Sequence, residues 1–156
     1  MRLVLKQRMF SWFDSYDVCD EYGNAVFSVK GRLSWGHLLE IYNSAGCKVG
    51  VLKEKILKLL PTFEIYINDS YVGCIKKEFT FFKPKFDLDF CGWNVSGDFF
   101  GWDYSVYNGG MEIMRVSKEL LHLTDTYVID VFDDNNALAG LLIALAIDAE
   151  KCSNGG

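Results

Sequence analysis

Five times along the chain an alternating apolar stretch runs into a polar turn and is followed by a second stretch, and the fifth time the second stretch is a helix. The clearest case is residues 62–79, where apolar residues alternate on both sides of the short turn Asn68-Asp69. Alternation around turns rich in Gly and Asn is typical of β-hairpins. The series therefore predicts a mainly β protein of antiparallel strands.

Counting these stretches predicts about twelve strands. We expect them near residues 2–7, 10–20, 25–31, 37–43, 48–55, 62–68, 70–79, 82–90, 93–100, 102–108, 112–119 and 125–132. So long a meander would leave exposed strand edges, and closing it into a barrel removes them. The pattern therefore predicts a closed antiparallel barrel wrapped around a central, C-terminal hydrophobic α-helix.

The expected helix, residues 136–150, is apolar on every side from Ala137 to Ile147. Such a helix must be surrounded by protein or by lipid. At about 1.5 Å per residue it is about 22 Å long. A helix that crosses a bilayer needs about 20 consecutive apolar residues, which span about 30 Å, so this helix is too short. We therefore favour a helix buried in the barrel over a membrane anchor. Its many Ala and Gly residues would let it lie close to the wall, and the preceding Asp and Asn residues would cap it.

The chain has two prolines and no linker-like run, which predicts one domain over residues 1–150 and a flexible tail over residues 151–156. The N-terminal residues show no long apolar segment of a secretory signal. Five widely spaced cysteines without a C-x-x-C pair argue against a disulfide framework and a zinc site. We therefore expect a cytoplasmic protein.

Six segments give the chain a family likeness. They are LKQRMFS (5–11), KEKIL (53–57), LPTFEIY (60–66), WNVSGD (93–98), SKE (117–119) and DTYVI (125–129), the last leading to the helix that ends at Asp148. In these segments the sequence resembles the LURP-one-related family, whose fold is shared with the tubby C-terminal domain and the phospholipid scramblases. The resemblance implies a twelve-stranded barrel around a hydrophobic helix. It leaves the function open, since fold does not determine function.

Catalytic chemistry has little support in the sequence. The sequence has two histidines, His37 and His122, and no candidate nucleophile lies in a motif such as G-x-S-x-G. Each histidine is therefore interpreted as a polar residue near a strand end or turn. Asp87 and Asp89 lie two apart on a strand and point to one face, which is typical of a solvated face. We expect a non-enzymatic protein without a cofactor.

The resemblance to scramblases, which respond to calcium, suggests one metal site to consider. Its oxygen ligands would come from the acidic turn before the helix: Asp130, Asp133, Asp134, Asn135 and Asn136. The spacing does not match an EF-hand loop, and the turn has no glycine. Helix capping explains the cluster without a metal, so no metal site is predicted.

The chain has a net charge of −5, and its charged residues are distributed unevenly along the sequence. Residues 48–85 hold eight basic and four acidic residues, whereas residues 86–156 hold three basic and twelve acidic ones. Arg2, Lys6 and Arg8 add positive charge near the N-terminus, which predicts a basic patch made by the first and the middle strands.

Tubby domains bind phosphoinositide headgroups through basic surface residues, and lysine clusters attract anionic membranes. Our first hypothesis is therefore a module peripheral to the membrane that binds anionic phospholipid or another phosphorylated ligand. The candidate residues are Lys53, Lys55, Lys76 and Lys77. Nucleic acid is not expected as a partner, because no recognition motif accompanies the basic strands.

The alternative hypothesis is a protein-interaction or scaffold domain that does not bind lipid. Its support is an aromatic-rich segment that could anchor an interface or equally belong to the core. The residues are Trp93, Phe99, Phe100, Trp102, Tyr104 and Tyr107.

Asp148 closes the apolar helix at the end where the helix dipole disfavours negative charge. We therefore predict that its carboxylate either reaches water at the barrel mouth or pairs with a Lys or Arg of the wall.

Overall fold

The computed structural model describes residues 1–6, 15–119 and 126–153. Within these residues the chain forms twelve strands, a short 3-10 helix (Asp134–Asn136) and the α-helix α1 (Ala137–Ser153). The strands are β1 (Arg2–Lys6), β2 (Ser15–Asp20), β3 (Ala25–Ser34), β4 (Gly36–Asn43), β5 (Lys48–Glu54), β6 (Thr62–Ile67), β7 (Ser70–Lys77), β8 (Phe86–Asp89), β9 (Trp93–Asp98), β10 (Asp103–Asn108), β11 (Met111–Glu119) and β12 (Thr126–Val131).

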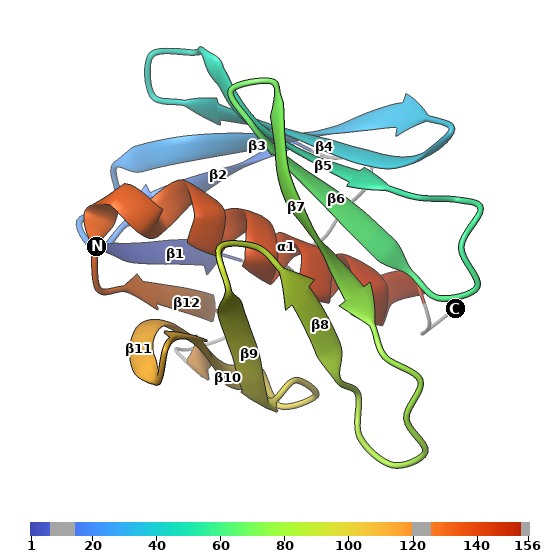
Figure 1. Cartoon of the computed structure of the whole chain (residues 1–156). Coiled ribbons are helices and arrows are strands. Elements are labelled where there is room, and N and C mark those ends of the chain that lie inside the picture. Colours follow the sequence, from blue (N-terminus) through green and yellow to red (C-terminus); the bar gives the residue numbers. More distant parts are fainter. Residues whose placement is uncertain (7–14, 120–125, 154–156) are drawn as a thin grey trace.

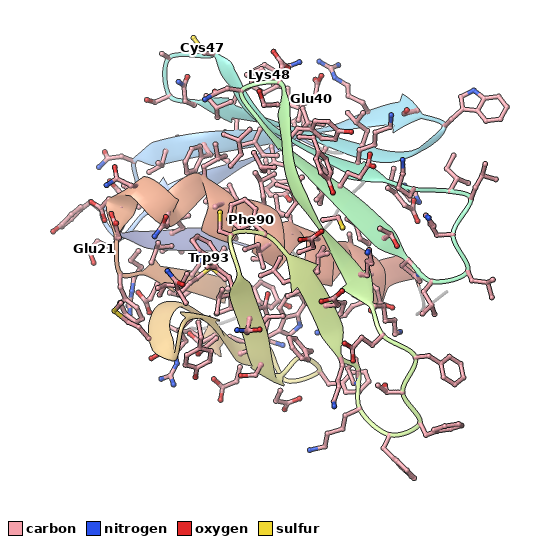
Figure 2. All side chains as sticks on the ribbon, viewed as in Figure 1. Glu21, Glu40, Cys47, Lys48, Phe90 and Trp93 are labelled. Atoms are coloured by element: carbon pink, nitrogen blue, oxygen red, sulfur yellow. The ribbon has the colours of Figure 1, made fainter. Side chains whose placement is uncertain are left out.

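All twelve strands belong to one antiparallel sheet in the order β8-β7-β6-β5-β4-β3-β2-β1-β12-β11-β10-β9. The sheet curls into a nearly closed barrel, and its two edge strands, β8 and β9, lie beside the same seam (Figure 1). Aromatic pairs close this seam: the rings of Phe86 and Phe99, and those of Phe90 and Trp93, both meet edge to face at 4.9 Å. Figure 2 shows the Phe90–Trp93 pair at the short β8–β9 turn. The predicted barrel is confirmed.

The helix α1 runs through the barrel and is its core (Figure 1). Every side chain from Leu141 to Ile147 has an exposed fraction of 0%, so the helix is buried all round, as its all-round apolar sequence predicts. The wall approaches closely, because a Cβ atom at Gly140 would lie 2.7 Å from the Met114 sulfur. In the part of the chain that the structure describes, no helix has the length and hydropathy needed to cross a bilayer.

Several element bounds differ from the sequence prediction. The strand expected at residues 82–90 is only Phe86–Asp89, because residues 78–85 form a loop that contains Pro84. The helix continues through Ser153, inside the segment predicted to be a flexible tail. Residues 10–14 of the second predicted strand lie outside the described residues.

Candidate functional site

The connections between the strands differ at the two ends of the barrel: one end carries longer loops, and the other carries short polar turns. Because successive strands are antiparallel, every second connection falls at the same end. The end where α1 finishes carries the β3–β4 turn (residues 34–36), the β5–β6 loop (55–61) and the β7–β8 loop (78–85), all on the right in Figure 1. We call it the loop end. The opposite end carries short polar turns such as Asn68-Asp69 and is called the turn end.

A pocket of about 230 Å³ opens at the loop end between the first two of these connections. Its apolar lining residues are Trp35, Ile56 and Leu57, and its charged lining residues are Lys53, Glu54, Lys55 and Lys58. The two connections pack closely: Gly36 has φ +91°, and a Cβ atom there would lie 2.8 Å from the Ile56 side chain. The β5–β6 loop is closed at its base by a 2.9 Å hydrogen bond that the Lys55 N–H donates to the Thr62 carbonyl.

Positive charge dominates this pocket. The ammonium of Lys55 lies 2.9 Å from the Glu64 carboxylate on the outer wall, and this hydrogen bond raises the pKa of Lys55. Glu54 turns toward His37, whose backbone N–H donates to it at 3.2 Å. Burial lowers the pKa of His37, and the nearby Glu54 carboxylate opposes this shift. Among the described residues, Lys53 and Lys58 are exposed and have no salt-bridge partner.

A second pocket at the loop end, of about 370 Å³, lies at the seam between β8 and β9. Lys83 and Lys85 line it together with Glu78, and its apolar lining includes Phe86 and Phe99, the aromatic pair that closes the seam. Both lysines are exposed. The two loop-end pockets therefore combine five lysines with two glutamates.

The structure separates the four lysines predicted from the sequence. Lys53, Lys55 and Lys76 are exposed, and Lys76 is placed directly opposite Asp87 in the neighbouring strand β8. Lys77 is half-buried instead, and its ammonium donates to the Glu150 carboxylate at 2.5 Å. Neighbouring residues of a strand point to opposite faces, so Lys76 and Lys77 cannot share a surface.

The structure tests the expected basic patch of the first strand only at Arg2. β1 lies between β2 and β12, with β2, β3 and β4 separating it from β5. Arg2 forms a 2.7 Å ion pair with Asp130 there, and this hydrogen bond raises the pKa of Arg2. Arg8 lies outside the described residues. Arg2 is therefore not part of a basic patch with the middle strands, and the contribution expected from Lys6 and Arg8 stays a prediction.

The acidic turn before the helix uses its carboxylates within the protein. Asp130 binds Arg2, and Asp134 accepts a 2.6 Å hydrogen bond from the Met1 amine. Asp133 caps the 3-10 helix by accepting from the Asn135 N–H at 3.0 Å. The capping interpretation is thus confirmed. Asp87 and Asp89 are both exposed on one strand face, as predicted.

The aromatic segment proposed as an interface is mostly core. Four of its six rings, those of Trp93, Phe99, Trp102 and Tyr104, are buried. Only Phe100 is strongly exposed, and it lies at the loop end. The surface on which the protein-interaction hypothesis rested is therefore absent from this described segment. His122 lies outside the described residues.

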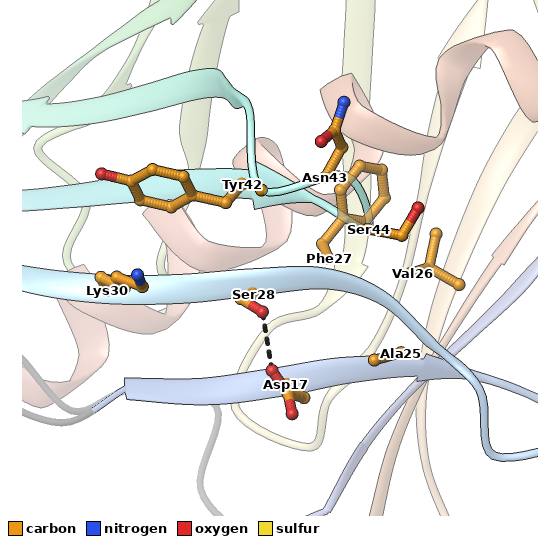
Figure 3. Close-up of a pocket in the computed structure, with 10 residues that line it drawn as sticks. Asp17, Ala25, Val26, Phe27, Ser28, Lys30, Tyr42, Asn43 and Ser44 are labelled. Carbon is orange, nitrogen blue, oxygen red and sulfur yellow. Dashed lines mark hydrogen bonds between the residues drawn. The ribbon is translucent and has the colours of Figure 1, made fainter.

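A third pocket, of about 310 Å³, lies on the outer wall over β2, β3 and β4 (Figure 3). Its charged lining residues are Asp17 and Lys30. Asp17 accepts a 2.7 Å hydrogen bond from Ser28, and the Lys30 ammonium lies 4.5 Å from the centre of the Tyr42 ring. With its opposite charges balanced and already engaged, this pocket is a poorer anion site than the loop end.

Three polar groups lie inside the barrel near the end of the helix. Asp148 is 3% exposed, so the alternative in which it reaches water is wrong. Burial raises the pKa of Tyr16 and of Tyr104, and the charge of the Asp148 carboxylate raises both further. In the part of the chain that the structure describes, neither tyrosine hydroxyl has a hydrogen-bond partner.

These tyrosines predict sensitivity to alkali. A tyrosine in the unfolded chain ionises near pH 10, whereas the buried tyrosines keep their protons to higher pH. The free energy of unfolding is therefore unaffected by these groups below about pH 10 and falls as the pH rises from there toward the folded pKa. Each pH unit above that point costs about 1.4 kcal/mol per tyrosine. We expect Tyr104→Phe to unfold at higher pH than the wild type and to gain up to about 1 kcal/mol at neutral pH. Urea unfolding at a series of pH values measures both effects, with the half-buried Tyr107→Phe on the same strand as control.

Comparison with known proteins agrees with the architecture. Residues 1–148 match the LURP-one-related family. The chain is 32% identical over 149 residues to uncharacterized protein YxjI of Bacillus subtilis (strain 168), covering 95% of this chain and 92% of the relative. Its fold is similar to the X-ray structure of an Arabidopsis thaliana protein, with a TM-score of 0.59 and 15% identity over 92% of this chain and 89% of that chain. Neither the family description nor the relative's name specifies an activity. The chain therefore belongs to the LURP-one-related family.

Proposed function

We propose that this barrel is a non-enzymatic module, peripheral to the membrane, that binds the phosphorylated headgroups of anionic phospholipids at its loop end. The observation that carries the proposal is the 230 Å³ pocket that Lys53, Lys55 and Lys58 line together with Trp35. Lys83 and Lys85 line the second pocket at the same end of the barrel, and Lys76 lies on β7 near that end. We call these six residues the loop-end lysines.

Electrostatics favours such a ligand. Each lysine near an anionic leaflet contributes about 1 kcal/mol of attraction. Five of the six, Lys53, Lys58, Lys76, Lys83 and Lys85, are exposed and have no salt-bridge partner among the described residues. Their charge is therefore available to a ligand, unlike that of Lys48, which is paired with Asp69 at 3.0 Å at the turn end.

The size of the pocket favours a surface headgroup over an enclosed metabolite. Sites for drug-sized molecules usually hold about 300–1,000 Å³. The 230 Å³ pocket is smaller, and Trp35, which lines it, is almost fully exposed. A phosphate group at a membrane surface fits such a shallow site, because the rest of the lipid stays in the bilayer.

Charge reversal tests the proposal. We expect the triple variant Lys53→Glu, Lys58→Glu, Lys83→Glu to bind vesicles containing about 25% phosphatidylserine at least tenfold more weakly than the wild type, since each lysine contributes about 1 kcal/mol. Binding of the wild type should also weaken as salt rises, because the charges are exposed. Vesicle sedimentation measures both effects.

A control variant with the same net charge separates a local site from overall charge. It carries Lys30→Glu, Lys48→Glu and Arg115→Glu on the wall and the turn end, and it should lose much less binding. If the loop-end variant binds the vesicles as well as the wild type does, the proposed site is refuted. Circular dichroism of each variant confirms that the barrel is folded.

A further inference from the structure

Apolar side chains are concentrated at the loop end. Thirteen large hydrophobic side chains are exposed in the described residues, and eight of them belong to the connections at this end. They are Trp35, Ile56, Leu57, Leu59, Phe79, Phe81, Phe82 and Phe100. Exposed apolar groups gathered in one place usually mark a surface that meets a protein or a membrane.

Five of these side chains project almost completely into solvent. The exposed fractions are 91% for Trp35, 97% for Leu57, 105% for Leu59, 86% for Phe81 and 95% for Phe82. They come from the tips of three separate connections that end on the same side of the barrel. Each can leave water entirely only if another phase or molecule covers the loop tips.

Contacts within the loops hold these tips in place. In the β7–β8 loop the Glu78 N–H donates to the Lys85 carbonyl at 2.8 Å, and the rings of Phe79 and Phe81 meet edge to face at 5.5 Å. The Thr80 hydroxyl donates to the Lys83 carbonyl across the same loop. The apolar tips are thus part of closed loops, which lowers the cost of ordering them on binding.

We propose that the apolar tips, Trp35, Leu57, Leu59, Phe81 and Phe82, insert into the interfacial region of an anionic bilayer, so that the barrel stands on the membrane with its loop end down. This inference rests on the proposed function and adds to it the orientation of the protein and a second source of affinity. Lysines flank the tips: Lys58 lies between Leu57 and Leu59, and Lys83 follows Phe82. Long lysine side chains can keep their charge at the headgroups while apolar neighbours enter the acyl region.

The chemistry of the tips favours a bilayer over a protein partner or a second copy of the chain. Protein interfaces commonly have a closely packed apolar core that is depleted of charged residues, lysine included. Here the tips are separate projections, and lysines lie among them. An aromatic and aliphatic surface interleaved with lysines complements an apolar phase that begins just below a layer of negative charge.

The emission of Trp35 reports insertion directly. Trp93 and Trp102 are buried, and the difference between the wild type and Trp35→Phe isolates the signal of Trp35. We expect this signal to shift to the blue and to be quenched by brominated acyl chains when vesicles with about 25% phosphatidylserine are added. The variant Leu57→Ser, Leu59→Ser, Phe81→Ser, Phe82→Ser should lose the shift and bind the vesicles at least tenfold more weakly. A control variant, Tyr22→Ser, Met111→Ser, Phe132→Ser, removes three exposed apolar groups from the turn end and should bind as the wild type does.

The two proposals fail in different ways. The serine variant should still bind soluble inositol hexakisphosphate as the wild type does, because its lysines are intact. Suppose that the charge-reversal variant loses vesicle binding, but the Trp35 emission does not shift and the serine variant binds as the wild type does. Insertion is then refuted and headgroup binding stands. If neutral and anionic vesicles produce the same Trp35 shift, insertion stands and the anionic headgroup proposal is refuted. If the wild type sediments as a dimer that the serine variant cannot form, and its Trp35 emission ignores vesicles, the tips serve a second copy and the insertion proposal is overturned.

Discussion

Leu142→Ala is expected to lower the free energy of unfolding by about 2–5 kcal/mol, which is enough to unfold a marginally stable domain. Leu142 lies in the middle of α1 with an exposed fraction of 0%. The wall is tight around it: a Cβ atom at Gly50 of β5 would lie 3.2 Å from a terminal methyl of Leu142. A strand wall surrounding the helix can collapse only partly into the space left by the removed atoms, so the cavity cost adds to the lost hydrophobic transfer.

Urea unfolding followed by circular dichroism measures this change. Leu142→Met keeps most of the volume and should cost less than about 1.5 kcal/mol. Leu57→Ala removes the same atoms from a side chain that is 97% exposed, and it should change the stability by no more than about 0.5 kcal/mol. Equal effects at positions 142 and 57 would mean that α1 is not the core of the folded protein in solution.

The architecture was predictable because the pattern that encodes it is redundant. Twelve alternating stretches and one helix that is apolar on every side leave few arrangements that cover every edge and face. The helix had to be surrounded, and the strands were the only elements available to surround it. Exact ends were less predictable: β8 is short because loop contacts compete for residues 78–85, and alternation alone does not show this competition.

The candidate site was only partly predictable. Lys53 and Lys55 were identified from local charge, and period-2 alternation could already have separated Lys76 from Lys77. Trp35 and the tips of the β5–β6 and β7–β8 loops were missed, because they lie outside the alternating stretches. That they lie at the same end of the barrel follows only from the direction of each strand. Tracing the direction of each strand through the meander would have placed these connections together.

Asp148 shows what the sequence could not supply. Its place near the end of an apolar helix suggested water or a basic partner, and the structure excludes water because the helix extends far enough to bury the carboxylate near Tyr16 and Tyr104. A second acid, Glu150, lies two residues further on and forms an ion pair with Lys77. Which of two nearby acids faces a particular wall residue depends on the rotation of the helix, and an apolar stripe that covers the whole helix does not fix that rotation.

Lys77→Met is expected to lower the free energy of unfolding by about 3 kcal/mol, because removing one partner of a buried ion pair is strongly destabilising. Glu150 is 3% exposed and receives the Lys77 ammonium at 2.5 Å, whereas the Lys77 side chain is 27% exposed. The pair joins the last turns of α1 to the end of β7. Its loss removes the lysine that neutralises a carboxylate with an exposed fraction of only 3%.

Three comparisons identify the cause of that loss. The double variant Lys77→Met, Glu150→Leu should recover much of the stability, because an apolar pair of similar volume avoids the cost of desolvating two charges. Lys55→Met breaks the more exposed pair with Glu64 and should cost no more than about 1 kcal/mol. The Lys77→Met variant should also bind anionic vesicles as the wild type does, because the Lys77 ammonium of the wild type is held by Glu150 and does not face the membrane. A loss of vesicle binding in this variant would instead place Lys77 on the lipid-facing surface. A cost at Lys77 no larger than that at Lys55 would show that the pair is solvated and contributes little to holding α1 in the barrel.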